Sequence, residues 1–115
     1  MTEPAFDRLL RLARAAGLPG VEAGTSYGRP ALKVAGKGFT GYHGEDAIPL
    51  AMPLEQKEML IEMAPEIYYE TDHYKGWPWV LVRMSAISDE ELTQRLVDAW
   101  RFRAPRKLLA SFEAG

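Results

Sequence analysis

The 115-residue sequence contains no cysteine and only two histidines. Without cysteine, disulfide bonds, thiol catalysis and cysteine-ligated zinc or iron–sulfur clusters are excluded. The sequence also has no apolar run close to the roughly 18 residues that a membrane-spanning helix requires. Its first residues carry acids and arginines where a signal peptide has an apolar core. We therefore expect a soluble, cytoplasmic protein with no membrane partner.

An excess of positive charge is lacking as well, because the formal net charge is −2. The charge is uneven along the chain: residues 1–44 carry +3, residues 45–72 carry −7 and residues 73–115 carry +2. A protein that binds nucleic acid is normally basic, so any contact with DNA must be confined to a local basic face. Hydrophobic residues make up 47% of the chain, which is enough for one core and a single domain over residues 1–115.

Hydrophobic periodicity predicts the order helix, strands, helix, strands, helix. Consecutive strands joined by tight turns form an antiparallel sheet, and the helices are available to cover one of its faces. The sequence therefore predicts an α+β fold of two layers, in which an antiparallel sheet of about five to six strands packs against two to three helices. The predicted helices cover residues 3–16, 54–63 and 89–104, the strands lie within 21–52, 66–70 and 79–84, and 106–112 form a last helical turn or two.

Local signals add detail to this arrangement. Thr2 can cap the first helix, and Ser88 with Glu91 forms a capping box at the start of the third. Gly36-Lys37 or Lys37-Gly38 is expected to close a hairpin. Pro49 lacks an N–H group, so the strand around Ile48–Met52 should lie at a sheet edge or be irregular there.

Two catalytic signatures occur within residues 24–41. Residues 24–28 match G-x-S-x-G, and residues 36–41 match G-x-G-x-x-G. Both motifs need a helix directly behind them, to raise a nucleophile or to hold a pyrophosphate. Here Pro30 and a strand pattern follow Ser26, and a turn follows Gly41. We interpret the glycines as turn and bulge residues, and expect a non-enzymatic protein with no catalytic residues and no cofactor.

Basic and aromatic residues are the main candidates for binding. Tyr74, Lys75 and Trp77 fall in a predicted turn, where an exposed aromatic side chain can stack on a base or anchor a partner protein. The alternative is that Trp77 folds back over the sheet. Four bases then occur within residues 101–107. They can neutralise phosphates or simply form a solvated helix end.

Two alternatives concern other ligands. Glu70, Asp72 and His73 are three potential ligands of a divalent metal, in a small-molecule or metal site beside the sheet, although a polar hairpin shoulder has the same composition. The strand around Ile48–Met52, if it lies at an edge, is a candidate for pairing with a partner protein.

Several segments occur in an order that is typical of one protein family: Gly20–Glu22, Tyr27–Val34, Gly36–Phe39, Pro65-Glu66, Tyr69–Tyr74, Trp79–Arg83 and Leu92…Ala99-Trp100-Arg101. Through these segments the sequence resembles the MmcQ/YjbR family of small bacterial proteins. The resemblance extends over nearly the whole chain and includes no catalytic signature.

This resemblance implies a fold similar to that of the bacterial frataxin homologue, an antiparallel sheet packed against helices. It also implies DNA binding through a double wing of hairpins, here Lys33–Phe39 and Tyr69–Trp79. Arg8, Arg11 and Arg14 lie along the first helix and would extend such a surface if they shared its face. The residues expected to contact DNA are Lys33, Lys37, Tyr74, Lys75, Trp77, Arg101, Arg103, Arg106 and Lys107.

Overall fold

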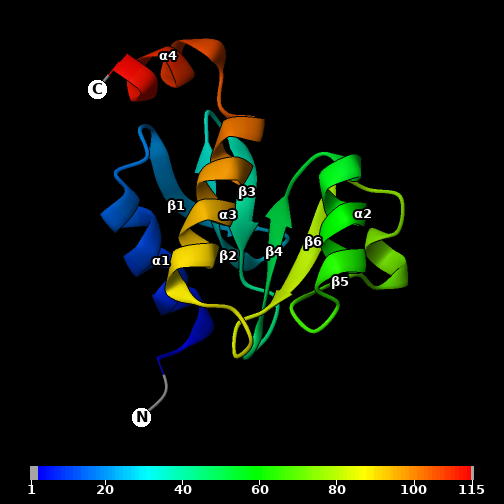
Figure 1. Cartoon of the computed structure of the whole chain (residues 1–115). Helices are drawn as coiled ribbons and strands as arrows, with labels where there is room; N and C mark the ends of the chain where they lie inside the picture. Colours follow the sequence, from blue (N-terminus) through cyan, green and yellow to red (C-terminus); the bar gives the residue numbers. More distant parts are fainter. Residues whose placement is uncertain (1–2, 115) are drawn as a thin grey trace.

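The computed structural model of the protein describes residues 3–114, and its helices α1, α2 and α3 cover one face of a single sheet (Figure 1). The predicted α+β, two-layer arrangement is therefore confirmed. The elements along the chain are α1 (Ala5–Ala16), β1 (Val21–Ser26), β2 (Arg29–Val34), β3 (Lys37–Gly41), β4 (Ala47–Ala51), α2 (Leu54–Met63), β5 (Tyr68–Tyr69), a 3-10 turn η1 (Asp72–Tyr74), β6 (Trp79–Arg83), α3 (Asp89–Arg103) and α4 (Arg106–Ala114).

The six strands are all antiparallel to their neighbours and follow the order β1-β2-β3-β4-β6-β5. Strand β6 lies between β4 and β5, so β1 and β5 form the two edges. The core lies between the helices and the sheet. It includes Leu9 and Leu12 of α1, Leu92, Leu96 and Trp100 of α3, and Leu32, Val34, Ile48, Leu50, Val80 and Val82 of the strands.

The helix starts agree only partly with the predicted caps. Ser88 Oγ accepts a hydrogen bond from the Glu91 N–H at 3.1 Å, which confirms this cap. The Glu91 carboxylate accepts from the buried Tyr68 hydroxyl, so it joins α3 to β5. At α1 the N-cap position is occupied by Pro4, and Thr2 lies outside the described residues.

Two hairpins close through two-residue turns with positive φ. Tyr27-Gly28 joins β1 to β2 with φ of 52° and 78°, and Ala35-Gly36 joins β2 to β3 with φ of 51° and 78°. Such turns match the twist of the flanking strands. The predicted turns at Gly36-Lys37 or Lys37-Gly38 are therefore wrong by one or two residues. Tyr27 is fully exposed at its tip, a position that the Tyr-Gly pair between two strand patterns could have indicated.

Strand β4 lies inside the sheet, so the prediction of an edge strand around Ile48–Met52 is wrong, and so is the adaptor surface based on it. Five residue pairs join β4 to β6, but only Thr40–Leu50 joins it to β3. Pro49 has no N–H to donate, and its carbonyl accepts a hydrogen bond from the Thr40 hydroxyl at 2.7 Å. The predicted irregularity at this proline is thus confirmed, because a side-chain hydroxyl serves the Pro49 carbonyl and a single residue pair joins β3 to β4.

Neither catalytic signature has the local structure that its chemistry needs. A tight turn and β2 follow Ser26, and a loop leading into β4 follows Gly41. At Gly41 only glycine leaves room for the backbone of β2, since a Cβ atom there would lie 2.8 Å from the Pro30 carbonyl oxygen.

Within residues 3–114, no helix combines the length and the apolar character needed to cross a membrane.

Candidate nucleic-acid interface

Strand direction brings several distant segments to one end of the sheet. The β2–β3 turn, the end of β4 and the start of β6 lie there, and α3 ends there (Figure 1, upper part). The Met52 N–H donates to the Pro78 carbonyl at 3.0 Å, which holds the last residues of the β5–β6 loop (residues 70–78) against the end of β4. Trp77 and Pro78 therefore lie at the same end of the sheet as the β2–β3 turn, whereas the η1 turn of this loop places Tyr74 beside His43, which precedes β4.

Arg103, in the last turn of α3, lies against two aromatic side chains at this end. Its guanidinium carbon lies 5.3 Å from the centre of the Trp79 ring and 5.3 Å from that of Phe102. Such cation–π contacts favour a guanidinium lying on an aromatic face. Within the described part of the chain, the buried Arg103 Nε has no hydrogen-bond partner. A guanidinium group held in a fixed orientation is suited to donate hydrogen bonds to an anionic group through its terminal nitrogens.

Trp77 and Lys75 project from the neighbouring loop. Trp77 is 64% exposed and Lys75 is also exposed, so the alternative in which Trp77 folds back over the sheet is wrong. Phe102 is 40% exposed at the end of α3. Sequence reasoning missed Phe102, because an aromatic residue among arginines at a helix end carries no signal of its surroundings.

A buried lysine holds this loop in place. Lys57 of α2 is 1% exposed. Its Nζ lies 2.8 Å from Glu70 Oε1 and donates to the carbonyls of Tyr74 at 2.7 Å and Trp77 at 2.9 Å. The ammonium group has three donors, and each has an acceptor here. Sequence reasoning missed this role as well, although Lys57 is the single base among eight acids in residues 45–72.

The remaining bases lie on adjacent elements. Lys37 is exposed beside the β2–β3 turn, and Arg106 and Lys107 are exposed in the first turn of α4. The packing of Phe112 on Trp100, with ring centres 5.1 Å apart, holds α4 against this end. We name the whole surface the basic–aromatic end; it comprises Lys37, Lys75, Trp77, Arg101, Phe102, Arg103, Arg106 and Lys107.

Acidic residues near this surface are fewer than the bases. Glu55 lies in the first turn of α2, Asp72 lies in η1, Glu113 lies in α4, and Glu70 of the β5–β6 loop is paired with Lys57. The acidic residues Glu58 and Glu62 are exposed further along α2. The basic–aromatic end is thus locally positive in a chain whose overall charge is negative.

Two residues expected to contact DNA do not join this surface. Lys33 is two residues before the β2–β3 turn, opposite Glu22 of β1, but its half-buried side chain extends over Gly24 of β1, away from that turn. Tyr74 is half-buried, with its ring 5.0 Å from that of His73 and 6.0 Å from that of His43. Burial raises the pKa of the Tyr74 hydroxyl and lowers that of His43.

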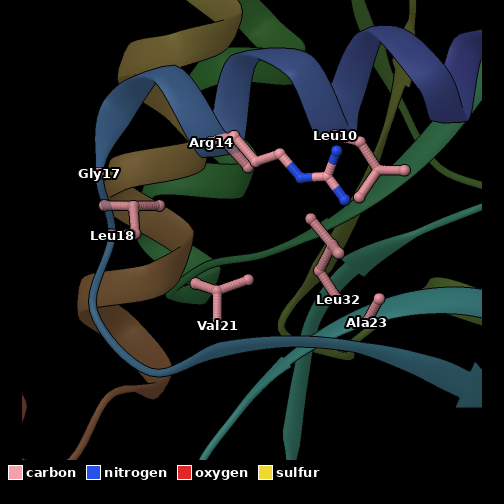
Figure 2. Close-up of a pocket in the computed structure, with 8 residues that line it drawn as sticks. Leu10, Arg14, Gly17, Leu18, Val21, Ala23 and Leu32 are labelled. Atoms are coloured by element: carbon pink, nitrogen blue, oxygen red, sulfur yellow. The ribbon is translucent and has the colours of Figure 1, made fainter.

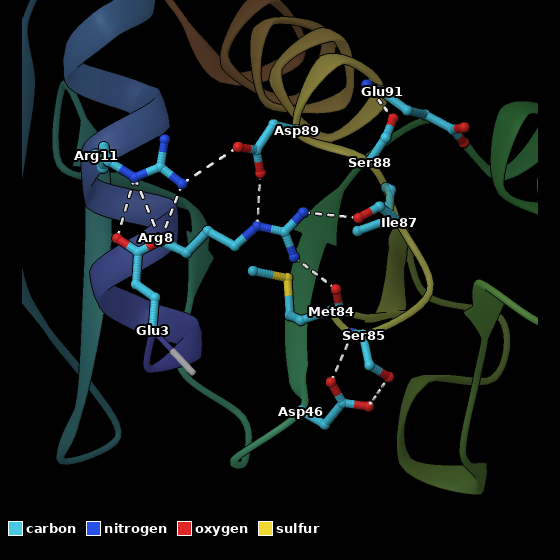
Figure 3. A network of polar contacts seen from close by, with 10 residues as sticks. All are labelled: Glu3, Arg8, Arg11, Asp46, Met84, Ser85, Ile87, Ser88, Asp89 and Glu91. Atoms are coloured by element: carbon cyan, nitrogen blue, oxygen red, sulfur yellow. Dashed lines mark hydrogen bonds and ion pairs between the residues drawn. The ribbon is translucent and has the colours of Figure 1, made fainter. Parts of the chain in front are cut away.

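Two arginines of α1 are also engaged elsewhere, near the other end of the sheet (Figure 3). Arg8 donates to Asp89 Oδ1 at 2.8 Å and to the carbonyls of Met84 and Ile87. Arg11 pairs with Glu3 and Asp89. The hydrogen bond from Arg8 holds the pKa of the Asp89 carboxyl below its usual value. These arginines therefore join α1 to the start of α3 and do not extend the basic–aromatic end.

The metal-site alternative is wrong for this arrangement. The Glu70 carboxylate is directed at Lys57, and the His73 ring packs against Tyr74. Among residues 3–114, no three acidic or histidine side chains converge closely enough to hold a metal ion.

Fold and surface together define a small, two-layer α+β domain with one cationic, aromatic end. The chain belongs to the YjbR family, whose model matches residues 16–102. It is 38% identical over 58 residues to uncharacterized proteins of Mycobacterium bovis and of two strains of Mycobacterium tuberculosis. The match covers 50% of this chain and 45% of each relative, so the chain spans less than half the length of these curated relatives.

Proposed function

We propose that this YjbR-family domain binds DNA through the basic–aromatic end, without sequence-specific contacts. The observation that supports this proposal most directly is the half-buried Arg103 guanidinium, which lies 5.3 Å from the ring centres of both Trp79 and Phe102. Five further bases, Lys37, Lys75, Arg101, Arg106 and Lys107, are exposed on β3, the β5–β6 loop, α3 and α4. Phosphate contacts of this kind supply most of non-specific DNA affinity.

Exposed aromatic side chains offer a second kind of contact with nucleic acid, which is stacking. Trp77 and Phe102 flank the bases, and aromatic rings stack on unpaired bases regardless of sequence. Single-stranded DNA should therefore bind at least as well as duplex DNA if Trp77 takes part. A cytoplasmic location, as expected from the sequence, would give the domain access to either form.

Fluorescence anisotropy with a labelled 20-base duplex tests the proposal. Because each phosphate contact contributes about −0.9 to the slope of log K against log salt, Arg106→Gln combined with Lys107→Gln should lower this slope by about 2. Arg103→Gln should weaken DNA binding more than the loss of one exposed base such as Lys107, since it also removes the guanidinium that lies against Trp79 and Phe102. Trp77→Ala should weaken single-strand binding more than duplex binding.

Lys33→Gln is the matched control, because it removes one positive charge from a strand residue that lies outside the surface. Binding by this variant should equal that of the wild type. If wild-type protein binds no DNA at low salt, or if Lys33→Gln reduces the salt slope as much as a change at Lys107 does, the proposal is overturned.

A further inference from the structure

A small cavity lies on the inner side of the sheet edge, beneath the C-terminal half of α1. It has a volume of about 190 Å³ and opens between α1 and strands β1 and β2 (Figure 2). Its apolar lining consists of Leu10, Ala13, Leu18, Val21, Ala23 and Leu32.

The walls of this cavity belong to the hydrophobic core. Ala13, Leu18 and Leu32 are buried, and Leu10 and Val21 are half-buried. Ala23 is exposed on the edge strand β1, so the cavity opens to solvent on that side. An apolar cavity of about 150 Å³ can hold a benzene molecule. The present cavity therefore has room for a short alkyl chain or a single ring.

Arg14 is the one charged side chain that lines the cavity. Figure 2 shows its guanidinium group over the opening, between Leu10 and Leu32. Within residues 3–114, Arg14 makes no side-chain hydrogen bond or ion pair, whereas Arg8 and Arg11 of the same helix are both paired. The guanidinium fork matches a carboxylate in geometry as well as in charge.

We propose that this cavity binds a small carboxylic acid, with the apolar group inside and the carboxylate on Arg14. An apolar chain alone would leave the guanidinium unpaired, and an anion without such a chain would leave the cavity unfilled. The site is separate from the basic–aromatic end, so the two proposals stand or fall independently.

NMR titration with hexanoate tests this site. Hexanoate should shift the methyl signals of Leu10, Leu18 and Leu32, and 1-hexanol, which has the same chain without the charge, should bind more weakly. Arg14→Gln should lower hexanoate affinity by about tenfold, as expected for loss of a charge-assisted hydrogen bond, and should leave 1-hexanol affinity unchanged.

A second variant keeps the test decisive. Ala23→Leu adds bulk at the exposed rim and should weaken both ligands without disturbing the core. Lys33→Gln, which follows the cavity-lining Leu32 on β2 but is not among the lining residues and faces the other side of the sheet, should change neither. Absence of methyl shifts at about 10 mM hexanoate, or equal affinity of wild type and Arg14→Gln, would show that the Arg14 stem only covers apolar surface and would overturn the proposal.

Discussion

Replacement of Lys57 by methionine should destabilise the protein through the loop that presents Trp77. Methionine keeps most of the apolar stem of lysine, so the change removes chiefly the ammonium group. That group serves one carboxylate, Glu70, and two backbone carbonyls, those of Tyr74 and Trp77, all within 2.9 Å. The substitution leaves all three acceptors without their donor.

The size of the effect follows from the burial of the two partners. A hydrogen bond to a charged group contributes about 1.5–3 kcal/mol, and breaking a fully buried ion pair costs about 3–5 kcal/mol. Lys57 is 1% exposed, but Glu70 is 31% exposed and can regain water once its partner is lost. We therefore expect a loss of about 2–4 kcal/mol in the free energy of unfolding. For a domain of this size that corresponds to a fall of roughly 8–16 °C in Tm.

Urea denaturation followed by circular dichroism measures this loss. Lys75→Met is the matched control, since Lys75 lies in the same loop and is exposed; its stability should stay within about 0.5 kcal/mol of wild type. Glu70→Gln should cost less than Lys57→Met, because the bonds from Lys57 to the two carbonyls remain. Amide hydrogen exchange in residues 70–78 should become faster in Lys57→Met.

An equal stability of Lys57→Met and Lys75→Met would refute this reasoning. It would mean that the loop is held by the packing of its other side chains, and that the buried ammonium offers no net stabilisation over an apolar group of similar volume. Unchanged hydrogen exchange in residues 70–78 would refute the role of Lys57 in ordering Trp77, even if global stability fell.

Two further predictions concern the strands and the other end of the sheet. Gly41→Ala should destabilise the protein by about 1–3 kcal/mol, because its Cβ would lie 2.8 Å from the Pro30 carbonyl oxygen. Gly38→Ala is the control, since no atom lies within 4 Å of its new Cβ. In thermal melts of both variants, Gly38→Ala should be nearly neutral. Asp89→Asn should lower the urea midpoint at pH 7, since Arg8 lowers the folded-state pKa of Asp89 from its ordinary value of 3.8. The ionised Asp89 carboxylate stabilises the folded protein at pH values above 3.8, and this stabilisation is lost as the pH falls through the lowered folded-state pKa. The difference in urea midpoint between variant and wild type should therefore vanish in acid. A difference that persists at about pH 2 would contradict this.

Most of the secondary structure was predictable because its signals are local. Apolar spacing predicted α1 and α3, Ser88 marked the start of α3, and the run at Trp79 predicted β6, all of which the structure confirms. The prediction that placed β4 at an edge failed for a different reason. Its place in the sheet depends on β6, which is more than 25 residues away in sequence and inserts between β4 and β5, and no local pattern encodes that pairing.

The residues of the candidate surface were likewise only partly predictable from the sequence. The sequence was sufficient to identify bases and aromatic residues near turns and the helix end, including Lys75, Trp77 and Arg103. It could not show that Lys33 lies opposite Glu22, or that Tyr74 packs against two histidines. Whether a side chain is exposed or buried depends on which distant segment packs against it.

By itself, therefore, the sequence determined the fold class, the absence of thiol chemistry and the presence of turns in place of catalytic motifs. These follow from composition and from short-range periodicity, which act within a few residues. Only the tertiary structure decided that the β2–β3 turn, Trp77 with Pro78 and the end of α3 lie at one end of the sheet. It also decided that Lys57 would be buried beneath that loop and Arg14 left over a cavity. Alternating strand directions and helix packing bring these residues together across long stretches of chain, and that geometry exists only once the whole domain has folded.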